Sequence, residues 1–269
     1  MKNHKQIQKK FDHNGFYIAK NIVKENQIKK ILDTFCKVYF KNNPSSNFIK
    51  KKKIWDEDLF HQEIIKFRNE KPNEFSEVYD TVQPCVSVFH ILTGERISQI
   101  VATLLRCKPI ELSVYGSMVR MDTPHDVRNK TTLHQEMHIV NNPGLVLWMP
   151  LLAVIKDIGE LRILEKSHSD GEIIVKKNKD QDYITSRASK SFIPKKILNK
   201  YNEKAIRINK GDVLFFDNRL IHGSGKNTSK RIRFTCQIRF FNTMSNEFTP
   251  FAPRIKHNPH TLKKLGRKI

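Results

Sequence analysis

Apolar residues in the first part of the chain recur at the three- and four-residue steps of amphipathic helices. Ile28, Ile31, Leu32, Phe35 and Val38 follow this spacing and would form one apolar stripe. The same periodicity predicts three further helices, over residues 59–67, 74–90 and 97–107. The N-terminal part of the chain is therefore expected to be mainly helical.

After residue 108 the spacing changes to short apolar runs that are typical of strands. These runs cover residues 110–121, 133–139, 145–152, 161–164, 205–208, 213–216 and 233–241. Turn-forming Gly, Pro, Asn and Asp residues separate them. Helices followed by many short strands predict a mainly β fold, a double-stranded β-helix (a cupin-like jelly roll) that the N-terminal helices buttress on one side.

A length of 269 residues is compatible with one domain built on a single large core. We expect residues 1–108 to form the helical part, 109–242 the jelly roll and 243–269 a basic tail. The interval 169–203 is polar, rich in lysine and longer than a plain strand connection. It is interpreted either as a lid over the site or as a surface insertion.

The cysteines and the apolar runs indicate where in the cell the protein is located. Cys36, Cys85, Cys107 and Cys236 lie far apart, without the Cys-x-x-Cys pair of a zinc site or the density of a disulfide framework. No apolar run resembles a signal peptide or reaches the roughly 20 residues of a membrane span. The prediction is a soluble, cytoplasmic protein.

The chain carries a net charge of +22, from 49 basic and 27 acidic residues. Such a surface attracts anions, which favours a small anionic or phosphate-bearing substrate, nucleic acid or acidic lipid as the partner. However, 35 of the basic residues are lysines and only 14 are arginines, so a biased coding composition explains the charge equally well. Nothing in the pattern indicates an oligomeric state.

Two histidines and a glutamate have the spacing of a metal site. On a strand, His134 and Glu136 would share one face because alternate side chains point the same way. His222 ends an apolar run and precedes Gly223-Ser224-Gly225, where small residues let a backbone approach a ligand closely. Two histidines and one carboxylate leave three octahedral positions open, which suits non-haem Fe(II) that binds a co-substrate and dioxygen together.

The residues beside these ligands separate this hypothesis from a zinc protease. On a helix, His134 and His138 would align, but the protease motif needs glutamate directly after its first histidine, and Gln135 stands there. On a strand, His138 faces the same way as His134. We interpret Gln135 and His138 either as substrate contacts or as groups that support the ligands.

An arginine eleven residues after His222 is the candidate anion clamp. The planar fork of Arg233 can hold a carboxylate through two parallel hydrogen bonds, which suits the far carboxylate of 2-oxoglutarate. Arg231 competes for this role because strand alternation would place it on the same face. Arg239 is less favoured because of its distance along the strand.

Motifs spread over most of the chain, except residues 41–73 and the C-terminal tail, match one known family. They are Phe11-x-x-x-Gly15-Phe16, the run from Leu133 to His138, Trp148 with Leu151, the run from Gly159 to Leu164, Ser167-His168-Ser169, and Gly211 to Phe216 leading to the run from His222 to Asn227. Together they resemble the phytanoyl-CoA dioxygenase (PhyH-like) family of Fe(II)/2-oxoglutarate-dependent oxygenases.

The resemblance implies an activity and assigns roles to residues. It implies that His134, Glu136 and His222 bind iron, that Arg233 binds 2-oxoglutarate, and that dioxygen is the other co-substrate. It also implies that Ser224, Trp148 and Met118 line or hold the co-substrate. The implied reaction is hydroxylation of an unactivated C–H bond of a small metabolite, with release of succinate and carbon dioxide.

Two other classes of protein stay open beside this enzyme. The family usually has aspartate where this chain has Glu136, which is the one hint of a jelly-roll protein that has kept the fold without turnover. The other class is a basic nucleic-acid-binding protein, suggested by an isoelectric point of about 9.9. No groove-reading motif accompanies that charge, so binding to nucleic acid would rest on electrostatics alone.

Overall fold

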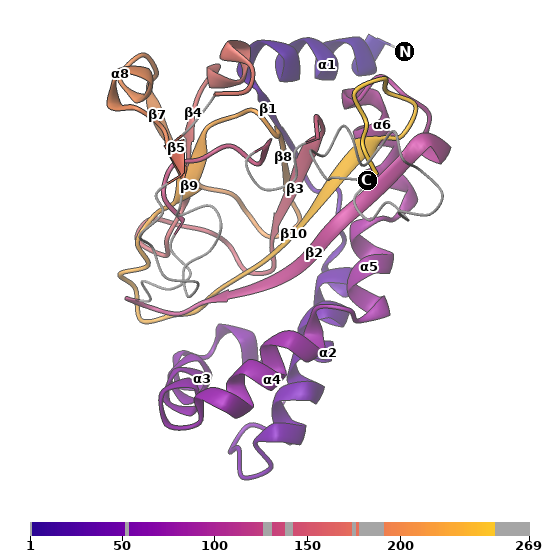
Figure 1. Cartoon of the computed structure of the whole chain (residues 1–269). Coiled ribbons are helices and arrows are strands. Elements are labelled where there is room, and N and C mark those ends of the chain that lie inside the picture. Colours follow the sequence, from indigo (N-terminus) through magenta and orange to yellow (C-terminus); the bar gives the residue numbers. More distant parts are fainter. Residues whose placement is uncertain are drawn as a thin grey trace, which may run out of the picture.

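The computed structural model describes residues 2–51, 54–125, 131–137, 142–173, 176–177 and 191–250. Two antiparallel sheets face each other, and helices cover the outer side of the larger one (Figure 1). The large sheet has the order β1-β8-β3-β10-β2 and the small one β7-β4-β9, while β5 and β6 form a separate ribbon. The first strand, β1, pairs with β8 and so joins the N-terminal part to the sheet.

The elements have the following bounds. The strands are β1 (Phe16–Ala19), β2 (Leu112–Asp122), β3 (Leu145–Pro150), β4 (Leu161–Leu164), β5 (Lys176–Lys177), β6 (Ser191–Phe192), β7 (Glu203–Ile206), β8 (Val213–Asp217), β9 (His222–Ser224) and β10 (Arg233–Asn242). The helices are α1 (Lys2–Asn14), α2 (Glu25–Asn42), α3 (Asp58–Glu70), α4 (Pro72–Val82), α5 (Val86–Leu92), α6 (Glu95–Leu104) and α8 (Lys195–Leu198), with short 3-10 turns η1 (Ile54–Asp56), η2 (Pro109–Glu111) and η3 (Ser167–Asp170).

Alternate residues of the large sheet belong to two separate cores. On β3, Leu145, Leu147 and Met149 pack with the helices, while Val146 and Trp148 pack with the apolar side chains of the small sheet. This arrangement follows from the two-residue period of a strand that is buried on both faces. The large sheet therefore needs the helices on one side as much as it needs the small sheet on the other.

Strand β10 shows the same alternation, but its inner face is polar. The outer positions Phe234, Cys236, Ile238 and Phe240 belong to the core that the sheet shares with the helices. The intervening positions are Arg233, Thr235, Gln237 and Arg239, all buried. A strand with this pattern carries a row of polar groups into the space between the two sheets.

Three of the four helices predicted from the apolar spacing are confirmed as α2, α3 and α6. The helix predicted over residues 74–90 is wrong as a single element, because the chain forms α4 and α5 with a break around Pro84. Proline lacks the backbone N–H that a continuous helix needs, and its ring clashes with the carbonyl of the residue four positions earlier. Helix α1 was not predicted, since it begins with a strongly polar run.

The prediction of a mainly β fold is wrong in its proportions. In the described part of the chain helix makes up 40% and strand 23%, so the fold is mixed α/β with antiparallel sheets. The strand expected over residues 133–139 is also wrong where it is described, because His134 forms an isolated bridge and Glu136 lies in a turn. The strands predicted at β2, β3, β4, β7, β8 and β10 are confirmed, with shifts of one or two residues at their ends.

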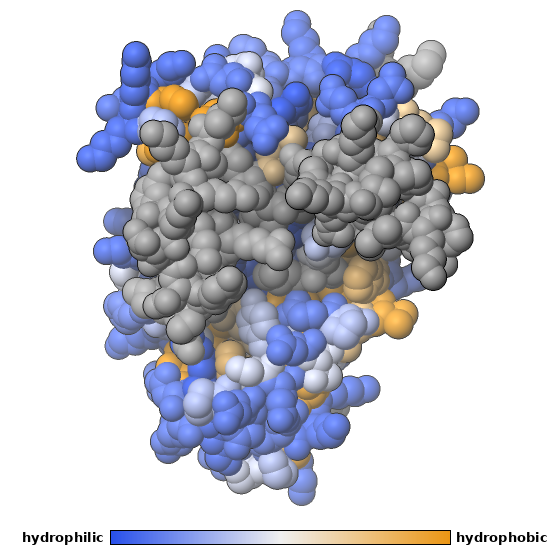
Figure 2. Space-filling view, in the orientation of Figure 1, coloured by the Kyte–Doolittle hydropathy of each residue, from blue (hydrophilic) through white to orange (hydrophobic). Residues whose placement is uncertain are grey.

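The interval 169–203 is described only at its two ends. There it adds the β5–β6 ribbon and the short helix α8. Residues 178–190 and the tail beyond residue 250 lie outside the described residues, so the lid and the basic tail stay predictions. In the described ranges, no helix combines the length and apolar character needed to cross a membrane. Figure 2 shows a surface on which hydrophilic residues predominate and apolar ones form small patches.

His61 fastens α3 to the start of β10 through both of its ring nitrogens. Nε2 lies 2.8 Å from the Trp55 carbonyl oxygen and must carry the proton, because a carbonyl only accepts. Nδ1 accepts a hydrogen bond from the backbone N–H of Ile232 at 3.1 Å. Burial lowers the pKa of His61 below its usual 6.5, and the positive charge of Arg231 contributes to this shift. The neutral ring is therefore the form that fits the fold.

This neutral ring predicts a dependence of stability on pH. The unfolded chain takes up the His61 proton first as the pH falls through about 6.5, so the stabilisation present above that pH is lost below it. We expect His61→Gln to lower the free energy of unfolding at pH 7.5 by about 1–3 kcal/mol through a lost hydrogen bond. Between pH 7.5 and pH 5.5, the free energy of unfolding measured by urea denaturation should decrease less for this variant than for the wild type. Equal decreases would contradict the assignment.

Candidate metal centre and active site

A backbone bridge at the edge strand β9 of the small sheet brings the predicted histidines together. His134 and His222 pair as an isolated antiparallel bridge, each backbone N–H donating to the carbonyl oxygen of the other at 2.9 Å. The turn after His134 places Glu136 beside them, and all three side chains are buried. The two-residue spacing therefore brings both ligands to one place even though the segment is a bridge and a turn and not a continuous strand.

The ligand atoms of these three residues converge. Nε2 of His134 lies 3.8 Å and Nε2 of His222 lies 3.4 Å from Oε1 of Glu136. Each Nδ1 faces a backbone carbonyl oxygen, that of Thr132 at 2.7 Å and that of Leu220 at 3.0 Å. Because a carbonyl only accepts, the proton of each neutral ring belongs on Nδ1, and Nε2 is free to bind a metal.

The electrostatics of the site favour the protonation states that metal binding requires. Burial alone would raise the pKa of Glu136, but the positive charge of Arg239 beside it holds this pKa well below the usual value. Burial and the neighbouring His134 lower the pKa of His222. An ionised carboxylate and a neutral imidazole are the forms in which these groups coordinate metals.

Arg239, a less favoured candidate for the anion clamp, contacts the ligand glutamate instead. Its Nε donates to Oε2 of Glu136 at 2.8 Å, and its Nη1 donates to the backbone carbonyl of Gly116 at 3.2 Å. Its position six residues beyond Arg233 on β10 made it a poor candidate for binding 2-oxoglutarate. The same position places it beside Glu136. Alternation from Arg233 through residues 235 and 237 is the pattern that could have indicated it.

Arg233 lies in the interior with one nitrogen unused. Its Nε and Nη2 donate to Oδ2 of Asp122 at 3.1 and 2.6 Å, and its guanidinium carbon lies 6.0 Å from the ring centroid of Trp148. Nη1 is buried and has no hydrogen-bond partner among the described residues. Gly159 lies next to this nitrogen, where an added Cβ would stand 3.3 Å from it. A buried donor of this kind is expected to have a ligand.

Asp122 fixes the orientation of Arg233. While Oδ2 accepts from Arg233, Oδ1 accepts from Nη2 of Arg120 at 2.8 Å. Burial would raise the pKa of Asp122, but the two guanidinium groups hold it below its usual value. The carboxylate stays ionised and links β2 to β10 at the end of the row of polar side chains.

Arg231, the competing candidate, lies elsewhere. Strand β10 begins at Arg233, so the alternation assumed for residue 231 does not extend to it. Its Nε lies 3.1 Å from Oδ1 of Asp58 in α3, and its side chain is 35% exposed. The structure therefore places Arg231 against the helical part and away from the triad.

The remaining predicted residues differ in their surroundings. Ser224 is buried on β9 with its hydroxyl 3.0 Å from that of Thr131, and Trp148 is buried beside Arg233. Met118 pairs with Gln237 on β10, but its side chain lies outside the described residues, as does the whole of His138. Their predicted roles toward 2-oxoglutarate and substrate stay predictions.

Gln135 has a different environment from its neighbours. Its amide nitrogen donates to the carbonyl oxygens of Gly171 at 2.8 Å and Arg219 at 2.5 Å, and its Oε1 accepts from the N–H of Ile173 at 2.9 Å. Both N–H groups are used in fixing the backbone of two loops. This gives Gln135 a supporting role and removes the basis for a substrate contact.

The three converging residues are the one such metal-binding cluster among the described residues. Two imidazoles and one carboxylate suit ferrous iron, and the unpartnered Nη1 of Arg233 suits a carboxylate of 2-oxoglutarate. A hollow of about 670 Å³ between the small sheet and neighbouring loops has Thr131, Ser224 and Gly225 in its wall. It therefore lies against the strand that carries His222.

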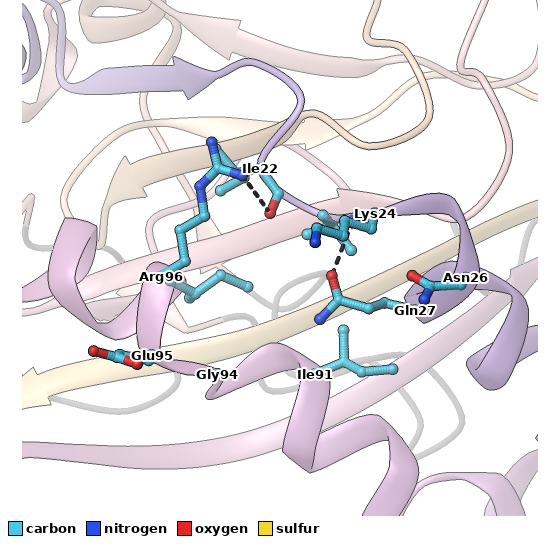
Figure 3. A pocket seen from close by; sticks show the side chains of 10 residues that line it. Ile22, Lys24, Asn26, Gln27, Ile91, Gly94, Glu95 and Arg96 are labelled. Atoms are coloured by element: carbon cyan, nitrogen blue, oxygen red, sulfur yellow. Dashed lines mark hydrogen bonds between the residues drawn. The ribbon is translucent and has the colours of Figure 1, made fainter.

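A second hollow, of about 380 Å³, lies away from the triad. It lies between the start of α2 and the α5–α6 turn, where Arg96 donates to the carbonyl of Ile22 and the Lys24 N–H donates to Gln27 (Figure 3). Its polar groups serve helix ends and the turn between them. We therefore assign no part of the metal chemistry to it.

A buried centre of two histidines and one carboxylate inside a double sheet defines a non-haem iron oxygenase that uses 2-oxoglutarate. The chain belongs to the phytanoyl-CoA dioxygenase (PhyH) family, whose model matches residues 11–235. Iron and 2-oxoglutarate are its cofactors. None of the curated proteins matches the sequence.

Solved structures share the fold at low sequence identity. The epimerase SnoN, in complex with Fe3+, alpha ketoglutarate and nogalamycin RO, has a TM-score of 0.61 and 10% identity, over 90% of this chain and 84% of its own. The apo non-heme monooxygenase ThoJ has a TM-score of 0.57 and 14% identity, over 88% of this chain and 77% of its own. AviO1 from Streptomyces viridochromogenes Tue57 has a TM-score of 0.56 and 16% identity, over 93% of this chain and 98% of its own. These likenesses establish a common fold with double-stranded β-helix oxygenases.

The ligand assignment predicts the effect of removing one histidine. His222→Ala should weaken Co(II) binding more than about 100-fold, since loss of a direct ligand exceeds the 10–100-fold cost of losing an outer partner. His90→Ala, which changes an exposed histidine on α5, serves as the matched control and should bind as the wild type does. Titration followed by the visible absorption of Co(II) measures both, and an unchanged affinity for His222→Ala would remove His222 from the triad.

Proposed function

We propose that this protein hydroxylates an unactivated C–H bond of a small, anionic metabolite, using Fe(II), 2-oxoglutarate and dioxygen. The reaction would consume one molecule each of 2-oxoglutarate and dioxygen and return succinate, carbon dioxide and the hydroxylated substrate. The observation that carries the proposal is the convergence of three buried ligand atoms in the same interior as a buried arginine nitrogen without a partner.

Each interior residue has a task in this scheme. His134, Glu136 and His222 would hold the ferrous ion, which supplies the redox chemistry and the open positions for co-substrate and dioxygen. Arg233 would bind the far carboxylate of 2-oxoglutarate through Nη1, already oriented by Asp122. The apolar side chains between the sheets would exclude water from the reacting groups.

The charges of the interior support an anionic substrate. Three guanidinium groups, of Arg120, Arg233 and Arg239, face two carboxylates, of Asp122 and Glu136. A ferrous ion and a 2-oxoglutarate dianion cancel each other, so one positive charge would remain. A substrate with a single carboxylate or a phosphate diester near this region would neutralise it, and the net charge of +22 would attract such a molecule.

The comparisons leave the type of oxidation to experiment. The proteins of similar fold include an epimerase, a monooxygenase and a carbocyclase. We favour hydroxylation because it is the simplest outcome of this chemistry. For location we propose the cytoplasm, since all four cysteines are unpaired thiols.

The function is tested by measuring succinate. Protein supplied with Fe(II), 2-oxoglutarate and dioxygen should release succinate faster when a substrate is present, and mass spectrometry should show a product heavier by one oxygen. A product of unchanged mass would indicate epimerisation instead. Absence of succinate with every candidate, despite binding of Fe(II) and 2-oxoglutarate, would favour a protein without turnover. Salt-sensitive binding to nucleic acid, with no metal binding, would favour the basic binding protein.

The role of Arg233 predicts a selective loss. Arg233→Met should raise the Kd for 2-oxoglutarate by about 10–150-fold, the 1.5–3 kcal/mol of a hydrogen bond to a charged group, while Co(II) affinity changes little. Arg231→Met, on a half-buried arginine that faces α3, is the control and should leave both affinities unchanged. Isothermal titration of each ligand distinguishes them, and the reverse pattern would transfer the clamp to Arg231.

The charge argument predicts a preference between matched substrates. Where a carboxylic acid is turned over, its primary amide should show a kcat/KM lower by at least about tenfold, because the amide leaves one interior charge unneutralised. Paired succinate assays on acid and amide, at the same ionic strength, give this ratio. An amide that reacts as well as the acid would contradict an anionic substrate and leave the oxygenase assignment intact.

A further inference from the structure

Arg239 is a buried cation that contacts a candidate metal ligand, and nothing in the 2-oxoglutarate chemistry uses it. We propose that Arg239 is a positioning residue that holds Oε2 of Glu136, so that Oε1 alone is presented to the metal. In this way a glutamate can serve in a place where the family usually has aspartate. The proposal rests on the proposed function, because it concerns the same metal site.

The contacts divide the glutamate carboxylate between two partners. Oε2 accepts from Nε of Arg239 at 2.8 Å, while Oε1 lies 3.4 Å from Nε2 of His222 and 3.8 Å from Nε2 of His134. Both Arg239 and Glu136 are buried, at 6% and 3% exposure. One oxygen is thus tied to the sheet and the other faces the two imidazoles.

A glutamate needs this restraint more than an aspartate does. Its extra methylene adds a rotatable bond, and ordering that bond costs conformational entropy at the moment of binding unless another contact has already fixed it. A free carboxylate can also bind a metal through one or both oxygens. With Oε2 engaged by Arg239, the single-oxygen mode is selected before the metal arrives.

The backbone of β2 is shaped to admit the guanidinium. The pairing of β2 with β10 shifts register between Gln237 and Arg239, which stand opposite Met118 and Tyr115. One extra residue is therefore inserted in β2, and Gly116 there has a φ of +63°. A Cβ on Gly116 would lie 2.9 Å from Nη1 of Arg239. The bulge and the glycine together make the space, and the Gly116 carbonyl accepts from Nη1 at 3.2 Å.

The two arginines of β10 are distinguished by what their nitrogens do. Arg239 uses Nε for Glu136 and Nη1 for the backbone of β2. Arg233 uses Nε and Nη2 for Asp122 and has an unpartnered Nη1 within the described structure. Only Arg233 therefore has a buried donor that still needs an anion, whereas Arg239 is directed at the ligand.

The first experiment measures Co(II) binding to the full chain. Arg239→Met should weaken Co(II) affinity by about 10–100-fold, the usual effect of removing a group that orients a ligand. It should also change the intensity of the Co(II) visible bands, which depends on coordination number, because Glu136 becomes free to bind through both oxygens. Arg231→Met is the control for loss of an arginine and should match the wild type in affinity and spectrum.

A double substitution separates positioning from a general effect on folding. In Glu136→Asp the shorter side chain cannot reach Arg239 and the metal position together. Adding Arg239→Met to that background should therefore change Co(II) affinity by less than about twofold. An effect as large as in the wild-type background would overturn the proposal, because Arg239 would then act independently of the glutamate.

A glycine substitution tests the same contact without removing a charge. Gly116→Ala should displace the guanidinium and weaken Co(II) binding, whereas Gly171→Ala adds a Cβ at a similar positive φ of +70° with nothing within 4 Å. The second variant also places an alanine at a positive φ, and it keeps the backbone carbonyl that accepts from Gln135, so it should bind Co(II) as the wild type does. This pair keeps the proposal testable if Arg239→Met fails to fold.

The outcomes distinguish this proposal from the proposed function. If the wild type binds no Co(II), the metal site itself is wrong. If it binds Co(II), and both Arg239→Met and Gly116→Ala bind it as tightly with unchanged spectra, Arg239 has no positioning role and the oxygenase assignment stands. Weaker binding by both, together with a wild-type-like Gly171→Ala, supports the proposal.

Discussion

The burial of charged side chains between the two sheets is the constraint on which the site depends. A charge removed from water without a partner costs several kcal/mol, so each one has to meet its opposite. Asp122 is shared by Arg120 and Arg233, and Glu136 is paired with Arg239. These pairings lower the pKa values of both carboxylates and fix the orientation of Arg233. They also set the position of Oε1 of Glu136, which faces the two histidines. They also link β2 to β10 and β10 to the ligand turn.

The same constraint explains why β10 is built as it is. Its inner residues carry the polar groups, so its outer residues must supply the apolar surface that stabilises the sheet, and they do so against the helices. The helical layer is therefore a requirement of the site and not an addition to a self-sufficient β fold. This is the physical reason that an expectation of a mainly β protein underestimated the helices.

The triad could be predicted from the sequence because both of its signals are local. One is the two-residue spacing of His134 and Glu136, and the other is the glycine that follows His222. The sequence also predicted the type of most elements, although Pro84 divides one expected helix and His134 lies in a bridge. Alternation from Arg233 could have placed Arg239 on the inner face of β10, but its partner and the role of Asp122 could not be assigned in advance. Their roles depend on the register of β2 against β10, and a one-residue bulge at Gly116 sets that register. Arg231 was misplaced because local alternation cannot tell where a strand begins.

The reciprocal backbone bridge between His134 and His222 has a consequence for metal supply. Because the bridge consists of backbone hydrogen bonds, the protein itself sets the mutual position of the two imidazoles. A site of imidazole and carboxylate ligands follows the general affinity order of divalent ions, in which copper and zinc bind more tightly than ferrous iron. Correct loading would then be a property of the cell that provides the ions: where free zinc is kept scarce, iron fills the site, and where it is not, the protein folds normally around the wrong metal.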